Sequence, residues 1–239
     1  MIRIPSLLVI CNNLYSQVTE VEGARRTKEA LDAWIANQEN VVAEMLKRPA
    51  KLRADAAQLE INMVSDMKQT LLAEKQAALD DVEARMRAVG ATPDHNSKIA
   101  LDTLDEHITM LLDKRYSQQA VVDDYRAAMQ EAQSWIEAVS RALDSLDGMT
   151  VDKKAARAGE VHADCEGGAE DKLEAVREKA EAAAREVGDM DRQNVQEQTR
   201  SVERRVAELR KRVERRKQGH YSIENDVALG VALKHIQRF

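Results

Sequence analysis

Few side chains in this sequence are spaced for metal binding or catalysis. His162 and Cys165 are separated by two residues, so both could bind one metal ion, but a structural zinc site needs four ligands and no second pair accompanies them. The other histidines are scattered, at positions 95, 107, 220 and 235. No nucleophile is placed with its base, and no glycine-rich phosphate loop is present. We therefore expect no catalytic residue, no metal and no cofactor, in a protein that is not an enzyme.

A basic run from Arg200 to Lys217 is the strongest charged feature. It holds nine Lys or Arg and three Glu, a net charge of +6. The segment from Glu166 to Asp191, expected to lie antiparallel to it, has a net charge of −5. Three interpretations of the run remain open: a solvated or intrabundle face, a surface that binds an acidic protein or anionic lipid, and, least favoured, a surface that binds nucleic acid. The candidate partner-binding residues are Arg204, Arg205, Arg210, Lys211, Arg212, Arg215 and Arg216.

Nucleic-acid binding is disfavoured by the chain as a whole. The net charge is −6, the pI is near 5.5, and aromatic residues for base stacking make up only 3% of the sequence. Carboxylates fall on helix faces away from the apolar positions, where we expect solvated side chains and ion pairs such as that of Glu208 with Arg212.

The composition is typical of long helices and coiled coils. Charged residues make up 33% of the chain, and Ala, Leu, Val, Glu and Arg dominate over aromatic residues. Cys11 and Cys165 form no disulfide framework and fit a reducing compartment. No stretch reaches the roughly 18 apolar residues of a membrane-spanning helix. The opening residues resemble a signal peptide only weakly, so we expect residues 1–21 to form a tail and the protein to be cytoplasmic. From the helical composition, we expect an all-α fold.

An apolar seam between Pro93 and Gly148 predicts one continuous helix. Its members alternate spacings of three and four, which is a heptad pattern over about 70 Å of helix at 1.5 Å per residue. Arg115 and Gln118 alone interrupt its apolar character, and such polar residues often fix helix register. The seam consists of Leu101, Leu104, Ile108, Leu111, Arg115, Gln118, Val122, Tyr125, Met129, Ala132, Ile136, Val139, Leu143 and Leu146.

Shorter seams flank this helix. Pro49, Gly90 with Pro93, Gly148, Gly167 with Gly168, Gly188 and Gly219 are expected to mark helix ends. In the first half, a seam of Leu52, Ala56, Leu59 and Met63 shifts phase before Leu71, Ala78, Val82 and Val89, without ending the helix. In the second half, the seams are Leu173, Val176, Ala180, Ala183, Val187 and Met190, then Val195, Val202, Val206, Leu209 and Val213.

Trp34 and Trp135 indicate an internal repeat of about a hundred residues, because Trp34-Ile35 aligns with Trp135-Ile136. Each period holds three amphipathic helices, which are stable when their apolar stripes pack together. The predicted helices are 22–48, 51–89 and 97–131, then 132–147, 168–187 and 191–218. The predicted domains are 22–131 and 132–218, the second shortened and with a long loop at 148–168, followed by a tail at 219–239.

These features resemble the spectrin-repeat family, whose members have three antiparallel helices, a Trp in the first helix, and a third helix that continues into the next repeat. The resemblance covers residues 22–218. Gln133-Ser134-Trp135-Ile136 and the run from Val202 to Leu209 are most similar to giant nesprins, particularly the insect muscle-specific form. The second repeat departs from the family, because its middle helix is short and its third helix lacks the usual second aromatic.

The resemblance implies tandem three-helix bundles and a structural rod or spacer that links the actin cytoskeleton to the nuclear envelope. It implies cytoskeletal or scaffold partners, with actin a candidate, and a place in the cytoskeleton or at the cytoplasmic face of the nuclear envelope. The family's actin-binding calponin-homology domains and membrane anchor are absent from this sequence. The alternative is a helical module that binds an acidic protein or anionic lipid through residues 200–217.

The expected core contains both tryptophans and most of the long seam, in a monomeric rod or a weakly self-associating one. Its members are Trp34, Trp135, Leu101, Leu104, Ile108, Leu111, Val122, Tyr125, Met129, Ile136 and Leu143.

Overall fold

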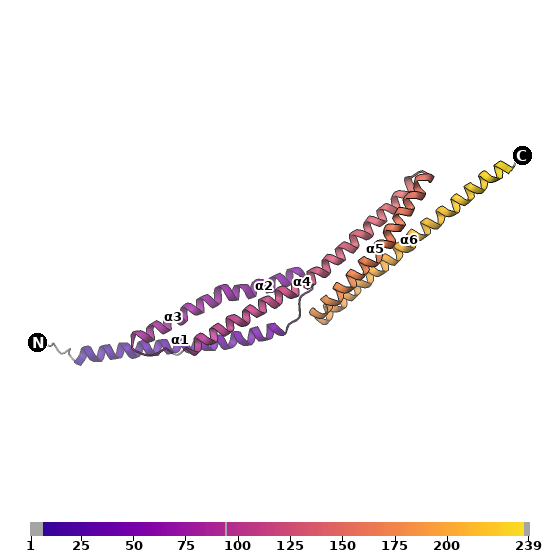
Figure 1. Ribbon diagram of the computed structural model, residues 1–239. Helices are drawn as coiled ribbons and strands as arrows, with labels where there is room; N and C mark the ends of the chain where they lie inside the picture. The colour runs from indigo at the N-terminus through magenta and orange to yellow at the C-terminus, as the bar shows by residue number, and fades with distance from the viewer. Residues whose placement is uncertain (1–6, 94, 237–239) are drawn as a thin grey trace. The chain divides into compact units, whose positions relative to one another are not determined.

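The described residues of the computed structural model, 7–93 and 95–236, are almost wholly helical and contain no β-strand (Figure 1). The predicted all-α class is therefore confirmed. The chain divides into two compact units, Met1–Gln119 and Ala120–Phe239. The helices are α1 (Leu7–Lys47), α2 (Ala54–Asp66), α3 (Leu72–Ala88), α4 (Asn96–Ser145), α5 (Val151–Glu186) and α6 (Asp189–Ile236), with a π-helical turn at Met67–Leu71 and a 3-10 turn at Leu146–Gly148.

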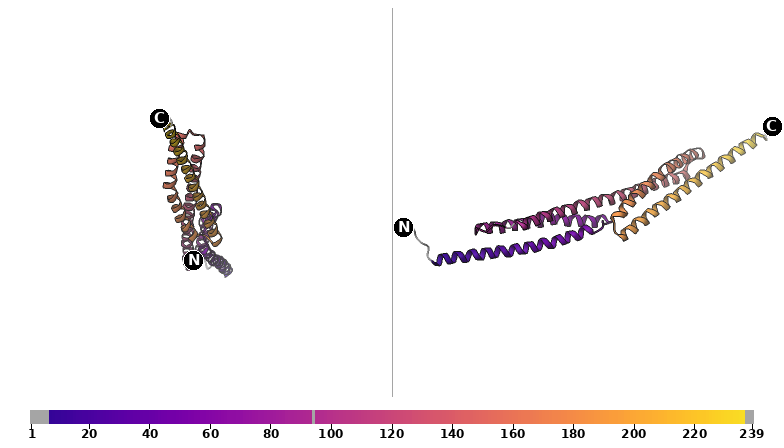
Figure 2. Two further views of the ribbon diagram at one scale, coloured as in Figure 1. Left: turned by 90° about the vertical axis from the view of Figure 1, so that its right-hand side faces the viewer. Right: turned by 60° about the horizontal axis from the view of Figure 1, so that its bottom comes forward.

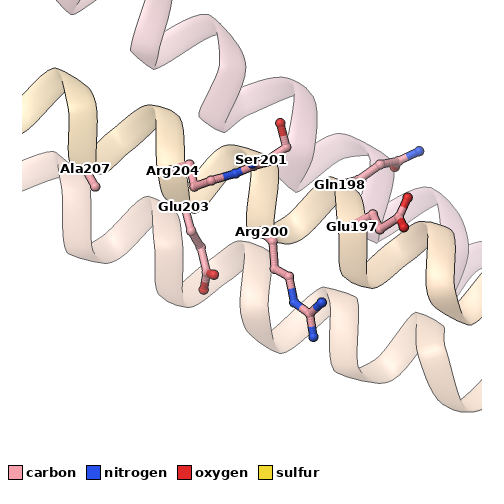
Figure 3. A pocket seen from close by; sticks show the side chains of 7 residues that line it. All are labelled: Glu197, Gln198, Arg200, Ser201, Glu203, Arg204 and Ala207. Carbon is pink, nitrogen blue, oxygen red and sulfur yellow. The ribbon is translucent and has the colours of Figure 1, made fainter.

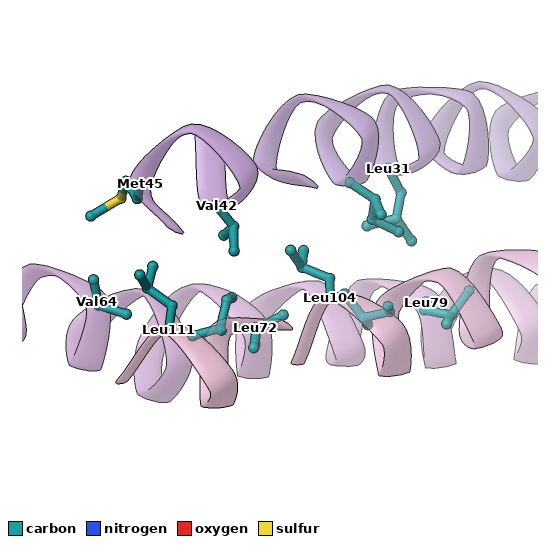
Figure 4. Packing of buried hydrophobic residues seen from close by; sticks show 11 residues of the cluster. Leu31, Val42, Met45, Val64, Leu72, Leu79, Leu104 and Leu111 are labelled. Atoms are coloured by element: carbon teal, nitrogen blue, oxygen red, sulfur yellow. The ribbon is translucent and has the colours of Figure 1, made fainter. Parts of the chain in front are cut away.

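The first unit packs α1, α2 with α3, and the first half of α4 around one apolar cluster (Figure 4). Fully burying a Leu or Ile side chain stabilises a fold by about 1.5–3 kcal/mol, so this cluster is the main source of the unit's stability. Its buried members are Leu31, Ile35, Val42 and Met45 of α1, Val64 of α2, Leu72 and Leu79 of α3, and Leu101, Leu104, Ile108 and Leu111 of α4.

A π-helical turn lets the middle helix of the first unit change phase without breaking. Buried residues recur every seven residues before the turn, at Ala57 and Val64, and again after it, at Leu72 and Leu79. From Val64 to Leu72 the interval is eight. The turn absorbs the additional residue, because the Leu72 amide bonds to the carbonyl of Met67, five residues earlier. The predicted phase shift within a continuous helix is confirmed.

The residues assigned to the first part of that seam were wrong. Leu59 and Met63 are 63% and 59% exposed, and the buried positions are Ala57, Ile61 and Val64. Leu71, placed just after the shift, is also exposed. Because a heptad pattern shifted by one residue still contains apolar side chains here, the sequence favoured the wrong phase.

The long seam of α4 is buried over its full length. Its thirteen residues in α4, Arg115 and Gln118 included, are less than 9% exposed, and so is Leu146 in the 3-10 turn that follows. The helix itself is continuous from Asn96 to Ser145, as the unbroken three-and-four spacing predicts. Side chains of α4 therefore contribute to the core of both units.

The second unit contains a long helix where a loop was expected. α5 begins at Val151, so the loop predicted at 148–168 is wrong and only Met149 and Thr150 connect it to the preceding 3-10 turn. The apolar pattern continues through this segment, because Ala158, Val161 and Cys165 are buried. α5 packs beside α6, as the views in Figure 1 and Figure 2 agree.

The predicted tails are also mostly helical. Residues 7–21 belong to α1 and residues 219–236 belong to α6, so Gly219 ends no helix. Residues 1–6 and 237–239 lie outside the described part of the chain. Met190, placed in a buried seam by its spacing, is 83% exposed because α5 ends at Glu186 and a new helix starts at Asp189.

Gly90 ends α3 in the left-handed conformation that glycine adopts without strain. Its φ is 76°, and the backbone amides of Gly90 and Ala91 bond to the carbonyls of Arg87 (3.0 Å) and Met86 (2.9 Å). These two bonds form a Schellman motif, which satisfies carbonyls left free at the helix end. The predicted helix end at Gly90 is thus confirmed.

Gly168 has a different role, because it lies inside α5 and makes room for a tryptophan. A Cβ atom at this position would lie 2.6 Å from Nε1 of Trp135 on α4. At Gly159 and Gly167 of the same helix, a Cβ atom would meet nothing within 4 Å. Only one of these three glycines is therefore required by packing.

We predict opposite effects from alanine at these positions. Gly168→Ala should destabilise the second unit by about 1–3 kcal/mol, because the indole of Trp135 must move. Gly159→Ala and Gly167→Ala should stabilise it by up to about 1 kcal/mol, because alanine favours the helix. Thermal unfolding followed by Trp135 fluorescence, in a Trp34→Phe background, measures all three. Equal effects at the three positions would contradict the packing role of Gly168.

Candidate functional site

The eleven predicted core residues occupy two kinds of position. Both tryptophans are only partly buried. Trp34 packs against the apolar cluster of the first unit, and the ammonium of Lys75 lies 5.1 Å from the centroid of its ring, within cation–π range. Nine are buried: Leu101, Leu104, Ile108, Leu111, Val122, Tyr125, Met129, Ile136 and Leu143.

Tyr125 brings a polar group into the core of the second unit. Its hydroxyl lies 3.3 Å from the Val195 carbonyl oxygen and 3.2 Å from Oε1 of Gln198, both on α6. Burial raises the pKa of the Tyr125 hydroxyl, so it stays protonated as a donor. This link between α4 and α6 was not predicted, because the sequence indicates only that position 125 is buried.

Arg115 is the centre of a buried polar network in the first unit. Its side chain is 5% exposed, and Nη2 lies 2.9 Å from Oε1 of Glu60. The two groups form an ion pair, but their geometry does not make a hydrogen bond. Nη1 donates to Oε1 of Gln118 at 2.7 Å and to the Arg48 carbonyl at 3.0 Å. Nη2 donates to the Met45 carbonyl at 2.5 Å. One guanidinium thus joins α4 to the end of α1 and to α2.

The same end of α1 receives a second cation. Lys114 Nζ donates to the Leu46 carbonyl at 2.5 Å, next to the carbonyl that Arg115 binds. α1 ends at Lys47, so the carbonyls of its last turn carry the negative end of its dipole, and of these the Met45 carbonyl also accepts the Arg48 amide at 3.1 Å. Two cations from α4 therefore cap α1, which gives a physical reason for a charged residue in an apolar seam.

The predicted partner-binding residues of α6 fall into two groups. Arg210 pairs with Glu170 of α5 at 3.3 Å, and Arg212 pairs with Asp144 of α4 at 3.0 Å. Arg216 binds both carboxylate oxygens of Asp147, at 2.5 and 3.0 Å. These three cations hold α6 to its neighbours, as the intrabundle interpretation requires. The predicted pair of Glu208 with Arg212 is wrong, because Arg212 turns toward α4 instead.

Electrostatics at the Arg216–Asp147 pair are consistent with this geometry. Hydrogen bonding to Arg216 holds the pKa of the Asp147 carboxyl below its usual range, and the same bond raises the pKa of Arg216. The pair is largely exposed, so its contribution to stability is small and falls with salt.

The second group of cations faces solvent. Arg204, Arg205, Lys211 and Arg215 are exposed and have no carboxylate partner among the described residues, and Arg200 shares this state. Arg200 and Arg204 border an open depression on α6 (Figure 3). The sequence could not separate this group from the first, since all nine cations lie in one run.

His162 and Cys165 are not arranged to hold a metal. Cys165 is buried on the core side of α5, and burial raises the pKa of its thiol, which disfavours the thiolate that a metal binds. Nε2 of His162 instead lies 3.3 Å from a carboxylate oxygen of Glu214 and 3.3 Å from Nζ of Lys217. No group of three metal-binding side chains occurs in residues 7–93 and 95–236.

None of the helices, over the part of the chain that is described, is long and apolar enough to span a bilayer.

We predict that the Arg115 network stabilises the first unit. Arg115→Met should lower the free energy of unfolding by about 3–5 kcal/mol, because it leaves Glu60 buried without its cation. Arg115→Met with Glu60→Met should recover part of that loss. Urea unfolding followed by Trp34 fluorescence, in a Trp135→Phe background, measures both. A double variant as unstable as the sum of the two single variants would rule out coupling.

Comparison with known proteins identifies a relative of the chain. No family model matches it, and no solved structure matches it. Over 215 residues it is 29% identical to muscle-specific protein 300 kDa of Drosophila melanogaster, which covers 86% of this chain but only 2% of that protein. The predicted resemblance to an insect muscle-specific form is confirmed, and the chain is similar over most of its length to a small part of a very long muscle protein.

Proposed function

We propose that this chain is a non-catalytic structural spacer in a cytoskeletal linker that connects actin filaments to the nuclear envelope. The observation that carries the proposal is the seam of α4, whose thirteen buried residues supply core to both units. A helix used this way is suited to a load-bearing segment, because each unit's core is built on the same covalent element. The similarity to a muscle protein supports a structural role.

The internal contacts are suited to resisting mechanical force rather than to catalysis. The network around Arg115 ties three helices of the first unit together, and Tyr125 joins α4 to α6 in the second. Each of these contacts must break before the helices of a unit can slide past one another. A spacer needs that resistance to shear, whereas it needs no concave site for a substrate.

The cellular setting follows from the same resemblance. The proposed partners are cytoskeletal or scaffold proteins, with actin reached through other parts of a longer linker. The proposed place is the cytoskeleton, including the cytoplasmic face of the nuclear envelope. Cosedimentation with actin filaments tests whether this chain itself binds actin, because a pure spacer stays in the supernatant at physiological salt.

We predict that the full chain, held by its ends in an optical trap, unfolds in discrete steps and refolds when relaxed. Each unit has its own core, so each should unfold cooperatively. Arg115→Met should lower the force at which the first unit unfolds and leave that of the second unit unchanged. Gly168→Ala should lower the force at which the second unit unfolds and leave that of the first unit unchanged. Gradual lengthening without steps would show an unfolded tether and would overturn the spacer function.

A further inference from the structure

We propose that the outer face of α6 is a docking surface for an acidic α-helix of a partner protein. The surface is a cation stripe formed by Arg200, Arg204, Lys211 and Arg215. Binding through this stripe goes beyond the spacer role, since a spacer needs no lateral partner.

The four cations share one face of the helix. Their spacings are four, seven and four residues, which at 3.6 residues per turn keep them in a single row about 22 Å long. The row lies opposite the buried residues of the same helix: Val202, Val206, Leu209 and Val213. The order of spacings is the same in both directions, so a partner helix can match it whether it runs parallel or antiparallel to α6.

The stripe is distinct from the cations that hold the bundle together. Arg210, on one flank of α6, reaches α5. On the other flank, Arg212 reaches α4 and Arg216 reaches Asp147 in the 3-10 turn that follows α4. Glu203 is engaged as well, by Arg177 of α5 at 2.8 Å. The stripe cations therefore stay free for an external carboxylate after all these internal pairs have formed.

The middle of the stripe is accessible. Ala207 lies between Arg204 and Lys211, and its short side chain lets a partner approach the helix closely. It also lines the open depression that includes Arg200 and Arg204, together with Glu197, Gln198, Ser201 and Glu203 (Figure 3). Glu197 and Glu208 reduce the local charge but do not cancel four cations, so the face stays net positive.

A protein helix fits this face better than a membrane or a nucleic acid. The large exposed apolar residues described in the second unit are Met149 and Met190, and neither is on the stripe, so nothing there inserts into lipid. Aromatic side chains that stack on bases are also missing from the stripe. Three of its four cations are arginines, whose planar forks bind carboxylates through two parallel hydrogen bonds.

The test uses the full chain and two synthetic helical peptides of identical composition. One peptide carries four Glu at the spacing of the stripe, and the other has the same four Glu distributed around the helix. The first should bind at low salt and weaken as salt rises, and it should bind about tenfold or more tightly than the second. Equal binding of both peptides would overturn the proposed helical match.

Matched variants separate the stripe from overall charge. Reversing the stripe with Arg200→Glu, Arg204→Glu, Lys211→Glu and Arg215→Glu should abolish peptide binding. The control reverses four exposed cations elsewhere, with Lys51→Glu, Lys98→Glu, Arg141→Glu and Lys153→Glu, and should retain it. Circular dichroism checks that both variants remain helical. Equal loss of binding in the two would refute the proposal.

Two further probes address the other classes of partner. Vesicles containing phosphatidylserine and a short duplex DNA are titrated with the unaltered chain under the same conditions. Weaker binding to both than to the matched peptide supports a protein partner. Tighter, stripe-dependent binding to either of them would overturn this assignment and point to a membrane or a nucleic acid.

Discussion

Burial of one face of α4 is the constraint on which both units depend. Its seam places thirteen side chains in the cores, and their spacing of three and four residues keeps them on one side of a 50-residue helix. The other helices are amphipathic and gain most of their stability from packing against such a seam rather than from their own helix propensity. Interrupting the seam therefore affects more than one element at once.

Arg115 is the instructive exception within that seam. A buried cation is costly unless it is paired, and here Glu60 and two backbone carbonyls offset the cost of removing it from water. The carbonyls matter because α1 ends at this level, and a cation there interacts favourably with the negative end of the helix dipole. The polar residue thus fixes where α1 ends against α4, whereas an apolar residue would pack equally well at several registers.

Periodic features of the fold were accessible to sequence reasoning, and features set by a neighbour were not. The seam of α4 was predictable because every member obeys one local rule. The helix through 151–168 was missed because glycine normally disfavours helices, and nothing local shows that Gly168 lies under Trp135. Whether an arginine of α6 pairs with a carboxylate also depends on the side of the helix it occupies. The net charge of the whole run does not contain that information.

The division of cations on α6 has an energetic consequence. Exposed ion pairs such as Arg212 with Asp144 contribute only about 0.2–1 kcal/mol each, so they do not fully offset the crowding of nine positive charges between Arg200 and Lys217. The repulsion that remains is concentrated among the unpaired side chains of the outer face. Any acidic partner that binds there relieves it in the folded state alone, so binding must also stabilise the second unit. Docking on α6 and resistance to unfolding are therefore coupled, because the same charges govern both.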